Sequence, residues 1–380
     1  MNHPGPDPVQ RGASHTINEI AQQPGVWREV SKAAAAVRDL TESLVTRQGA
    51  RVVLTGAGTS AFAGQVLAPA LRRGLRRRIE AVPTTDIVSN PVEALGEDLP
   101  TLLVSFARSG DSPESVAAAE LADQLLSDVH HLVLTCNPDG QLAQRYSNHE
   151  RARVLLMPEE ANDKGFAMTS SFTGMTLAAL LALDPSVEPS LAARLSVIAD
   201  QVFASWDAQA RDLVARRYER LVYLGSGALK GLAHESALKA LELTAGQIMA
   251  MGDSPLAFRH GPKSVLNDST LVVMYLSNDP HTRAYDLDVL HEIQGSLGDE
   301  HVLAVTADHG DEVSARSSWV LPDAADLQDA ALAMPAVLCA QLIAFHSSLA
   351  LGLTVDNPFP SGEVNRVVQG VRIHAFGNSR

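Results

Sequence analysis

Short apolar segments alternate with longer Ala- and Leu-rich helical segments along this chain of 380 residues. Five strand candidates fall in the first half, at residues 51–55, 79–82, 101–106, 131–135 and 153–157. Each is apolar on both faces, which is typical of a parallel strand covered by helices on either side. The pattern therefore predicts an α/β fold in which strand, helix and strand follow one another to build a parallel sheet.

The same order of elements recurs in the second half. A break at Pro185 and Pro189 is followed by a helical stretch at 191–217, a strand at 221–224 and a glycine turn at 225–227. Further strand candidates lie at 247–251, 271–276, 301–305 and 319–321. Because the second glycine turn has the same place in the order as Gly56-Ala57-Gly58, we expect a duplicated module.

We therefore expect two tandem modules, each a doubly wound parallel sheet flanked by helices, preceded by a helical start around 17–47. The predicted divisions are an N-terminal tail and helix at 1–45, a first module at 46–190, a second at 191–356 and a C-terminal tail at 357–380. One uncharged segment, 330–354, is long enough to span a bilayer. Pro335, Gln341 and His346 interrupt it, so we predict a buried helix and no membrane partner.

Charge and cysteine usage narrow the function. Lys and Arg number 30 and Asp and Glu 44, so the net charge is −14, which argues against nucleic acid as a partner. Only Cys136 and Cys339 are present, too few for a disulfide framework or a thiolate zinc site. Since the N-terminal residues also lack an apolar signal-peptide core, we predict a cytoplasmic protein. We expect no metal and no cofactor.

Two loops rich in glycine and hydroxyl side chains follow predicted strands of the first half. One is Gly56-Ala57-Gly58-Thr59-Ser60 and the other is Ser109-Gly110-Asp111-Ser112. Where a strand gives way to a helix, free backbone N–H groups and nearby hydroxyls can hold an anion. A tight turn made for packing would look the same, but the pair together favours a phosphate cradle. The second half has Ala228-Leu229 after its turn, so we assign phosphate binding to the first half.

A second group of candidates follows the turn at 225–227. Glu235, Lys239 and Glu242 are four and three residues apart and therefore share one helical face. An ordinary salt bridge on a solvated surface would have the same spacing. The neighbouring residues are apolar on nearly every side, which predicts a largely buried helix whose charges need a partner or a purpose.

A histidine turn, Arg259-His260-Gly261-Pro262, follows this helix. The stiff Gly-Pro break suits a side chain held at the edge of a cleft, although a lone histidine is more often structural. His234-Glu235 begins like a zinc-protease motif, but Leu238 stands where the second histidine would be, so that motif fails.

With these residues the chain resembles the sugar isomerase (SIS) domain family, as found in the isomerase half of glucosamine-6-phosphate synthase. Within the family it is most similar to the tagatose-6-phosphate ketose/aldose isomerase and galactosamine-6-phosphate deaminase branch. The resemblance is carried by segments in both halves, namely 19–24, 54–60, 83–86, 105–115, 165–171 and 357–371.

The resemblance implies a role for each candidate. Glu242 would move a proton between C1 and C2 of the sugar, supported by Lys239 and Glu235. His260, which can come from the neighbouring subunit in this family, would assist ring opening. The phosphate would be bound by residues of the two loops, which are Gly58, Thr59, Ser60, Ser109 and Ser112. The expected assembly is a homodimer with composite sites, or a higher oligomer built from it, and the C-terminal tail would close over the substrate.

Two departures from the synthase pattern stand out. Arg366 takes the place of a lysine that forms a Schiff base with the ketose, and an arginine does not readily do that chemistry because its guanidinium stays protonated. Arg108 replaces a glutamine beside the second loop, where Ala107 also replaces a serine. We expect Arg108 to clamp the phosphate or the sugar.

The leading hypothesis is a deaminase that converts galactosamine-6-phosphate to tagatose-6-phosphate and ammonia. The nearest alternative is an aldose–ketose isomerase acting on a hexose 6-phosphate or another 6-anionic hexose, such as a sulfosugar. A non-catalytic sugar-phosphate sensor would predict an attached DNA-binding segment and a lost catalytic carboxylate, whereas Glu242 and His260 are kept. A glutamine-using synthase is disfavoured, because this sequence shows no amidotransferase segment with an N-terminal cysteine.

Overall fold

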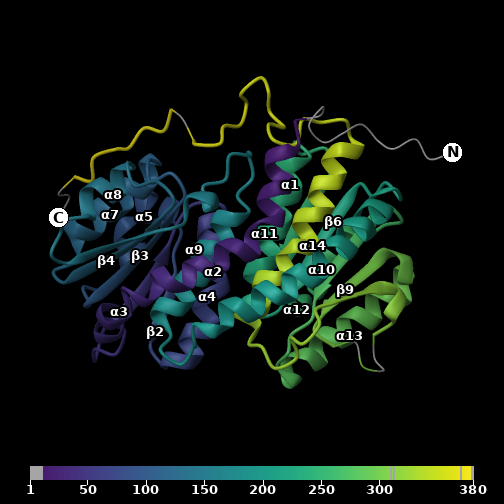
Figure 1. The fold of residues 1–380 in the computed structure, drawn as a ribbon, viewed down its shortest axis with the longest axis horizontal. Coiled ribbons are helices and arrows are strands. Elements are labelled where there is room, and N and C mark those ends of the chain that lie inside the picture. The colour runs from purple at the N-terminus through teal and green to yellow at the C-terminus, as the bar shows by residue number, and fades with distance from the viewer. Residues whose placement is uncertain (1–11, 309, 311–312, 369, 378–380) are drawn as a thin grey trace. The chain divides into compact units, whose positions relative to one another are not determined.

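The computed structural model describes residues 12–308, 310, 313–368 and 370–377, so 1–11 of the predicted N-terminal tail and parts of the C-terminal tail lie outside the described residues. The chain divides into two compact units (Figure 1). The first-sheet unit comprises residues 26–162, 171–192 and the chain from 364 onward. The second-sheet unit comprises the residues up to 25, 163–170 and 193–363. The domain boundaries suggested by the sequence stay a prediction.

The first-sheet unit is built on five parallel strands in the order β2-β1-β3-β4-β5. Their bounds are β1 Arg51–Thr55, β2 Arg78–Ala81, β3 Thr101–Ala107, β4 Val129–Thr135 and β5 Ala152–Leu156. Every residue of β1 and β3 is buried, as expected for central strands with helices on both faces. The predicted α/β class and all five predicted strands of this half are confirmed.

Helices cover both faces of this sheet. They are α3 Arg38–Val45, α4 Thr59–Leu75, α5 Thr84–Ser89, α6 Pro91–Leu95, α7 Pro113–Leu125, α8 Gln141–Tyr146 and most of α2 Gln23–Ala35 and α9 Ser170–Leu183, with a 3-10 turn, η2, at Glu159–Ala161. On one face, Val53 and Leu103 pack with apolar side chains of α5 to α8. On the other face α4 approaches closely, because a Cβ added at Gly64 would lie 3.1 Å from Leu54 Cβ.

The second-sheet unit repeats this arrangement. Its strands are β6 Arg220–Gly225, β7 Met249–Asp253, β8 Thr270–Tyr275, β9 Val302–Thr306 and β10 Ser318–Val320. The sheet order from the other edge is β7-β6-β8-β9-β10, all parallel, which matches β2-β1-β3-β4-β5 position by position. The predicted pair of tandem modules, each with a parallel sheet flanked by helices, is therefore confirmed.

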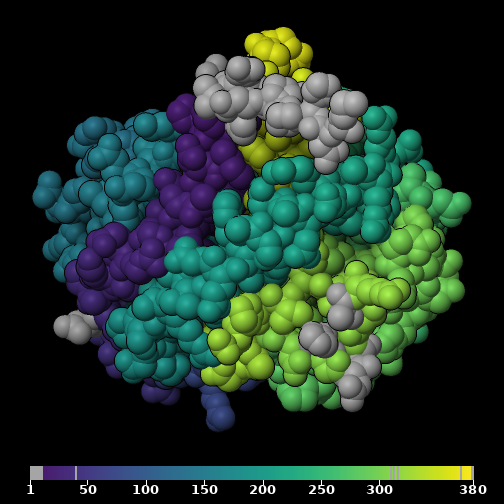
Figure 2. All heavy atoms as spheres, turned by 45° about the vertical axis from the view of Figure 1, so that its right-hand side comes forward, coloured from purple at the N-terminus to yellow at the C-terminus, as the bar shows by residue number. Residues whose placement is uncertain are grey.

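The helices of this unit are α1 Ser14–Ala21, most of α10 Ser190–Val214, α11 Ala228–Leu243, α12 Pro255–Arg259, α13 Pro280–Leu297 and α14 Asp329–Ala350, with 3-10 turns η3 Pro262–Val265, η4 Asp299–His301 and η5 Ala315–Ser317. The exposed side of α10 is visible as a teal band in Figure 2. In the described chain, α14 is the one helix long and apolar enough to cross a membrane, and its most apolar window is wholly buried. The prediction of a buried helix here is confirmed.

The N-terminal helical region differs from the expected single stretch. The predicted helix around 17–47 is three helices, α1, α2 and α3. Pro24 lies at the second position of α2, where a missing N–H is tolerated. In the interior of a continuous helix it would remove a hydrogen bond, so α1 ends before it.

Candidate functional site

The first loop joins β1 to α4 and depends on two glycines. A Cβ at Gly56 would lie 2.6 Å from the backbone carbon of Ser60, and Gly58 has φ 54°. A side chain at either position would be strained or would clash. The hydroxyl residues that follow, Thr59 and Ser60, are buried at the start of α4. The loop thus presents a close backbone and two hydroxyl residues at a helix N-terminus, as an anion site requires.

The second loop joins β3 to α7 and makes several internal contacts. Gly110 has φ 70°, and Ser112 precedes the first residue of α7. Ser109 Oγ accepts a hydrogen bond from Asp111 N at 3.2 Å. The Ser112 hydroxyl donates to Glu114 Oε2 at 2.7 Å. Hydroxyls of this loop are therefore already engaged within the chain.

Both loops lie at the same edge of one sheet. β1 and β3 are neighbours, with Thr55 paired to Ser105 near their carboxyl ends. In the strand order β2-β1-β3-β4-β5, β2 is added on one side of β1 and the later strands on the other. The point between β1 and β3 is therefore where the order of strand addition reverses. Ligands in open α/β sheets bind in the crevice at such a switch point. The structure thus brings the predicted phosphate-binding residues of both loops to the same edge of one sheet.

Arg108 and Arg366, both in the first-sheet unit, meet through a backbone contact. Arg108 is 7% exposed, and its Nη2 donates to the carbonyl oxygen of Arg366 at 3.0 Å. The Arg108 carbonyl in turn accepts from Cys136 N at 3.2 Å. The Arg366 side chain is exposed. The role of Arg108 in clamping a substrate stays a prediction, and its guanidinium holds the tail backbone.

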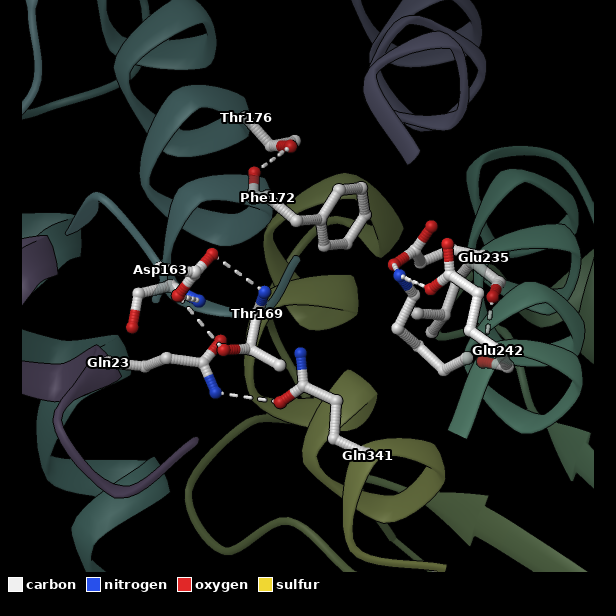
Figure 3. A network of polar contacts seen from close by, with 12 residues as sticks. Gln23, Asp163, Thr169, Phe172, Thr176, Glu235, Glu242 and Gln341 are labelled. Carbon is white, nitrogen blue, oxygen red and sulfur yellow. Dashed lines mark hydrogen bonds and ion pairs between the residues drawn. The ribbon is translucent and has the colours of Figure 1, made fainter. Parts of the chain in front are cut away.

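Glu235, Lys239 and Glu242 form a charged triad on α11 in the second-sheet unit. Glu235 and Lys239 are fully buried, while the Glu242 side chain is 23% exposed. Lys239 Nζ lies 3.5 Å from Glu235 Oε1 and also forms an ion pair with Glu242 (Figure 3). The buried helix that the sequence predicts is present. A buried cation between two carboxylates, one of them partly accessible, is suited to moving protons.

His260 ends α12 and is exposed, on a different element from the triad. Gly261 follows with φ 127°. The turn is anchored to α13, because Arg259 and Lys263 form ion pairs with Glu292 at 2.7 and 2.5 Å. The Lys263 ammonium lowers the pKa of Glu292 below its usual range. The structure thus holds the backbone of this turn and leaves the imidazole at the surface of the described chain.

A polar network in the second-sheet unit received no role from the sequence. Gln23 Nε2 donates to Gln341 Oε1 at 2.7 Å (Figure 3). Asp163 Oδ2 accepts from Thr169 N at 2.9 Å. The carboxylate of Glu19 accepts from Gly165 N at 3.1 Å, and burial raises its pKa, with a further increase from nearby Asp163. The segments 19–24 and 165–171 carried the family resemblance, but only the fold shows that they meet.

A further residue beside the first loop was also without a role. Thr84, at the start of α5, donates its backbone N–H to the carbonyl oxygen of Gly56 at 2.9 Å. Its buried hydroxyl has no hydrogen-bond partner among the described residues. The sequence signal was the segment 83–86, quoted in the resemblance without an assigned contact.

In the second sheet, the turn at 225–227 is equivalent to the first loop, and a carboxylate side chain binds it. Ser226 Oγ donates to Asp286 Oδ1 at 2.6 Å, and Ser277 N donates to Asp286 Oδ2 at 3.1 Å. Asp286 is fully buried, and this burial raises its pKa to about 6. In the second module, therefore, a carboxylate of the protein itself accepts hydrogen bonds at this turn.

Across the parts of the chain that the structure describes, no cluster of three or more His, Cys, Asp or Glu side chains is arranged to hold a metal ion.

Comparison with known proteins gives consistent matches. A family model described as the SIS domain matches residues 45–184. A Streptomyces coelicolor AgaS protein is 58% identical over 99% of this chain and 99% of its own length. The D-galactosamine-6-phosphate deaminase AgaS of Escherichia coli is 44% identical over 95% of this chain and 96% of its own. The crystal structure of a tagatose-6-phosphate ketose/aldose isomerase from Escherichia coli has a TM-score of 0.88 and 39% identity, covering 99% of this chain and 100% of that one.

Proposed function

Because this chain belongs to the SIS-domain family of the AgaS proteins, we propose that it deaminates an amino-sugar 6-phosphate, with D-galactosamine-6-phosphate giving tagatose-6-phosphate and ammonia. The observation that carries the proposal is the buried face of α11. There, Lys239 lies between the carboxylates of Glu235 and Glu242. Removing Lys239 and Glu235 from water costs free energy, which favours a role for them beyond packing.

In the proposed reaction Glu242 removes the proton from C2 of the open-chain amino sugar. The resulting enolamine regains that proton at C1, which gives a ketimine, and water hydrolyses the ketimine to ketose and ammonia. Lys239 stabilises the negative charge of the carboxylates between proton transfers, and Glu235 holds Lys239 in place. Partial exposure of Glu242 supports its role, because the group that meets the substrate must be reachable.

The 6-phosphate is assigned to the crevice between β1 and β3. Gly58, Thr59 and Ser60 supply the first loop, and Ser109 and Ser112 the second. Hydrogen bonds to a charged oxyanion contribute about 1.5–3 kcal/mol each, so a few suffice without a lysine cluster. The bond from Arg108 to the Arg366 backbone supports a tail that closes beside this loop.

His260 is assigned to ring opening, and its exposure supports action on a neighbouring subunit. The proposed assembly is a homodimer with composite active sites, or a higher oligomer of such dimers. We place the reaction in the cytoplasm, where the two buried cysteines would stay reduced.

A second candidate function is supported by the Escherichia coli structure named as a ketose/aldose isomerase. Isomerisation uses the same transfer of a proton from C2 to C1. The two reactions differ in whether C2 carries an amine or a hydroxyl and whether water reaches the intermediate.

The deciding experiment measures ammonia release from galactosamine-6-phosphate and glucosamine-6-phosphate, with galactose-6-phosphate isomerisation run in parallel. The proposal expects rapid ammonia release from the galactose epimer and none with Glu242→Gln. Isomerisation alone would favour the second candidate. If neither reaction occurs while sugar phosphates still raise the melting temperature, the protein is a binding module and the deaminase proposal is wrong.

A further inference from the structure

We propose that Glu114 makes the phosphate crevice select an oxyanion that carries a proton, a phosphate monoester, over one that carries none, a sulfate ester or sulfonate. The inference rests on the proposed function, which places the anion against Ser112. It deepens that function by assigning the chemical class of the anionic group.

A single hydrogen atom decides which anions Ser112 can accept as partners. Ser112 has one hydroxyl hydrogen, and it is donated to Glu114 Oε2 at 2.7 Å. Pro113, the first residue of α7, has no N–H with which to offer the anion a replacement. Asp111 N is likewise engaged, since it donates to Ser109 Oγ at 3.2 Å. The Ser112 hydroxyl and the Asp111 N–H are therefore committed to the protein itself.

With its hydrogen committed, Ser112 Oγ faces an incoming anion with lone pairs only. A favourable contact then requires the anion to donate a hydrogen bond. If the hydroxyl turns to the anion instead, its hydrogen bond to Glu114 is lost and the carboxylate meets the anion as a like charge. A ligand that brings a proton of its own avoids this loss.

Phosphate monoesters and sulfonates differ in their ability to supply this proton. The second pKa of a phosphate monoester is about 6, so a sizeable fraction still carries a proton near neutrality. Sulfate esters and sulfonates have none to give, and they meet the carboxylate as an unrelieved like charge. Glu114 should therefore exclude them and so exclude sulfosugars from this site.

Other charged groups around the loop do not remove this requirement. The Asp111 carboxylate is an acceptor itself, with Oδ1 bonded to Gln141 N at 3.0 Å. The Arg108 guanidinium donates one of its N–H groups to the Arg366 carbonyl at 3.0 Å, and its positive charge attracts phosphate and sulfate alike, so it does not distinguish between them.

The test uses Glu114→Gln and a matched control, Glu93→Gln, which makes the same charge change at an exposed residue of α6 in the same unit. Binding of inorganic phosphate and of sulfate is measured calorimetrically from pH 5.5 to 8. The wild type and the control should bind phosphate at least roughly tenfold more tightly than sulfate, and this preference should shrink as pH rises and phosphate loses its proton.

In Glu114→Gln, the amide can donate to Ser112 Oγ, which frees the hydroxyl hydrogen for the anion. The preference for phosphate should therefore fall to within about threefold, mainly through tighter sulfate binding. Glu114→Ala gives a second variant if the glutamine protein has a lowered melting temperature. Ser60→Ala with Ser109→Ala should weaken both anions, which locates them in this crevice.

Equal binding of phosphate and sulfate by the wild type would overturn the inference, as would an unchanged preference in both Glu114 variants. Binding of neither anion at millimolar concentration would overturn it as well. Failure of the proposed function is distinguishable. If no sugar phosphate is turned over while anion selection still depends on Glu114, the deaminase proposal fails and the selectivity inference stands.

Discussion

The two modules share one backbone design and differ in what occupies its switch point. Gly58 (φ 54°, ψ −127°) and Gly227 (φ 56°, ψ −120°) have nearly the same conformation, each just before the helix that follows the first strand of its sheet. In the first module, two loops with hydroxyl side chains follow the neighbouring strands β1 and β3. In the second, the carboxylate of Asp286 accepts hydrogen bonds from Ser226 and Ser277.

The two turns have the same backbone conformation, so we expect both to favour a negative charge nearby. We expect a substrate anion to bind at this place in the first module, whereas in the second module the Asp286 carboxylate accepts the hydrogen bonds there. The helices that follow the two turns also differ in the residues at equivalent positions. Positions 235, 239 and 242 carry the triad on α11, and the equivalent positions of α4, at 66, 70 and 73, are Val66, Ala70 and Arg73. We expect one phosphate site per chain in the first module and the proton chemistry in the second.

The largest expected effect comes from Glu242→Gln in the second module. Loss of the carboxylate should lower kcat by about 10²–10⁴-fold, the usual contribution of a general acid–base group, and leave KM nearly unchanged. Steady-state kinetics with galactosamine-6-phosphate measure both constants, and Glu93→Gln is the control. Retained kcat would remove Glu242 as the proton carrier and end the proposed division of labour.

Local sequence patterns were sufficient for the parts of this comparison that lie close together in the chain. The strands β1 and β3 were predictable because each is a compact apolar run bounded by turn residues. The common face of Glu235, Lys239 and Glu242 follows from helical periodicity alone.

Other features depend on contacts between distant residues. Ser226 meets Asp286, which lies 60 residues later in the chain on α13, only in the folded unit. Nor does the sequence show which acceptor takes the single hydrogen of Ser112. The burial of Lys239 is likewise a property of the folded unit, because helical spacing is the same for an exposed salt bridge.

The second expected effect concerns the first module. Ser60→Ala combined with Ser109→Ala removes two hydroxyl donors from the proposed phosphate crevice. Because each hydrogen bond to a charged group contributes about 1.5–3 kcal/mol, KM should rise by roughly 100-fold or more. Bound substrate should still react, so kcat should change little. An unchanged KM in the same kinetic assay would disprove the assignment of the phosphate to this crevice.

The third effect is on stability and belongs to the second module. The pKa of Asp286 is raised to about 6 by burial and by nearby Asp329, against contacts from Ser226, Ser277 and Arg283 that lower it. Between about pH 4 and 6 the folded protein thus binds a proton that the unfolded chain has released, so the unfolding free energy falls as pH rises.

Asp286→Asn should remove this dependence, because the amide does not titrate. Its oxygen can accept from Ser277 N while its NH2 group donates to Ser226 Oγ. The difference in unfolding free energy between wild type and variant should change by about 2–3 kcal/mol from pH 4 to pH 7. Urea unfolding across this range measures it. A constant difference would mean that Asp286 is no more than an ordinary carboxylate.

The smallest effect sharpens the contrast between the two turns. Ser226→Ala removes the donor to Asp286 Oδ1 and leaves that buried carboxylate one hydrogen bond short. The unfolding free energy should fall by about 1–2 kcal/mol, while KM and kcat remain at wild-type values. The double variant at Ser60 and Ser109 should show the reverse pattern, with KM raised and stability nearly kept. A raised KM in Ser226→Ala would show that the turn at 225–227 also binds substrate. The bonds between Asp286 and this turn would then no longer explain why the two modules differ.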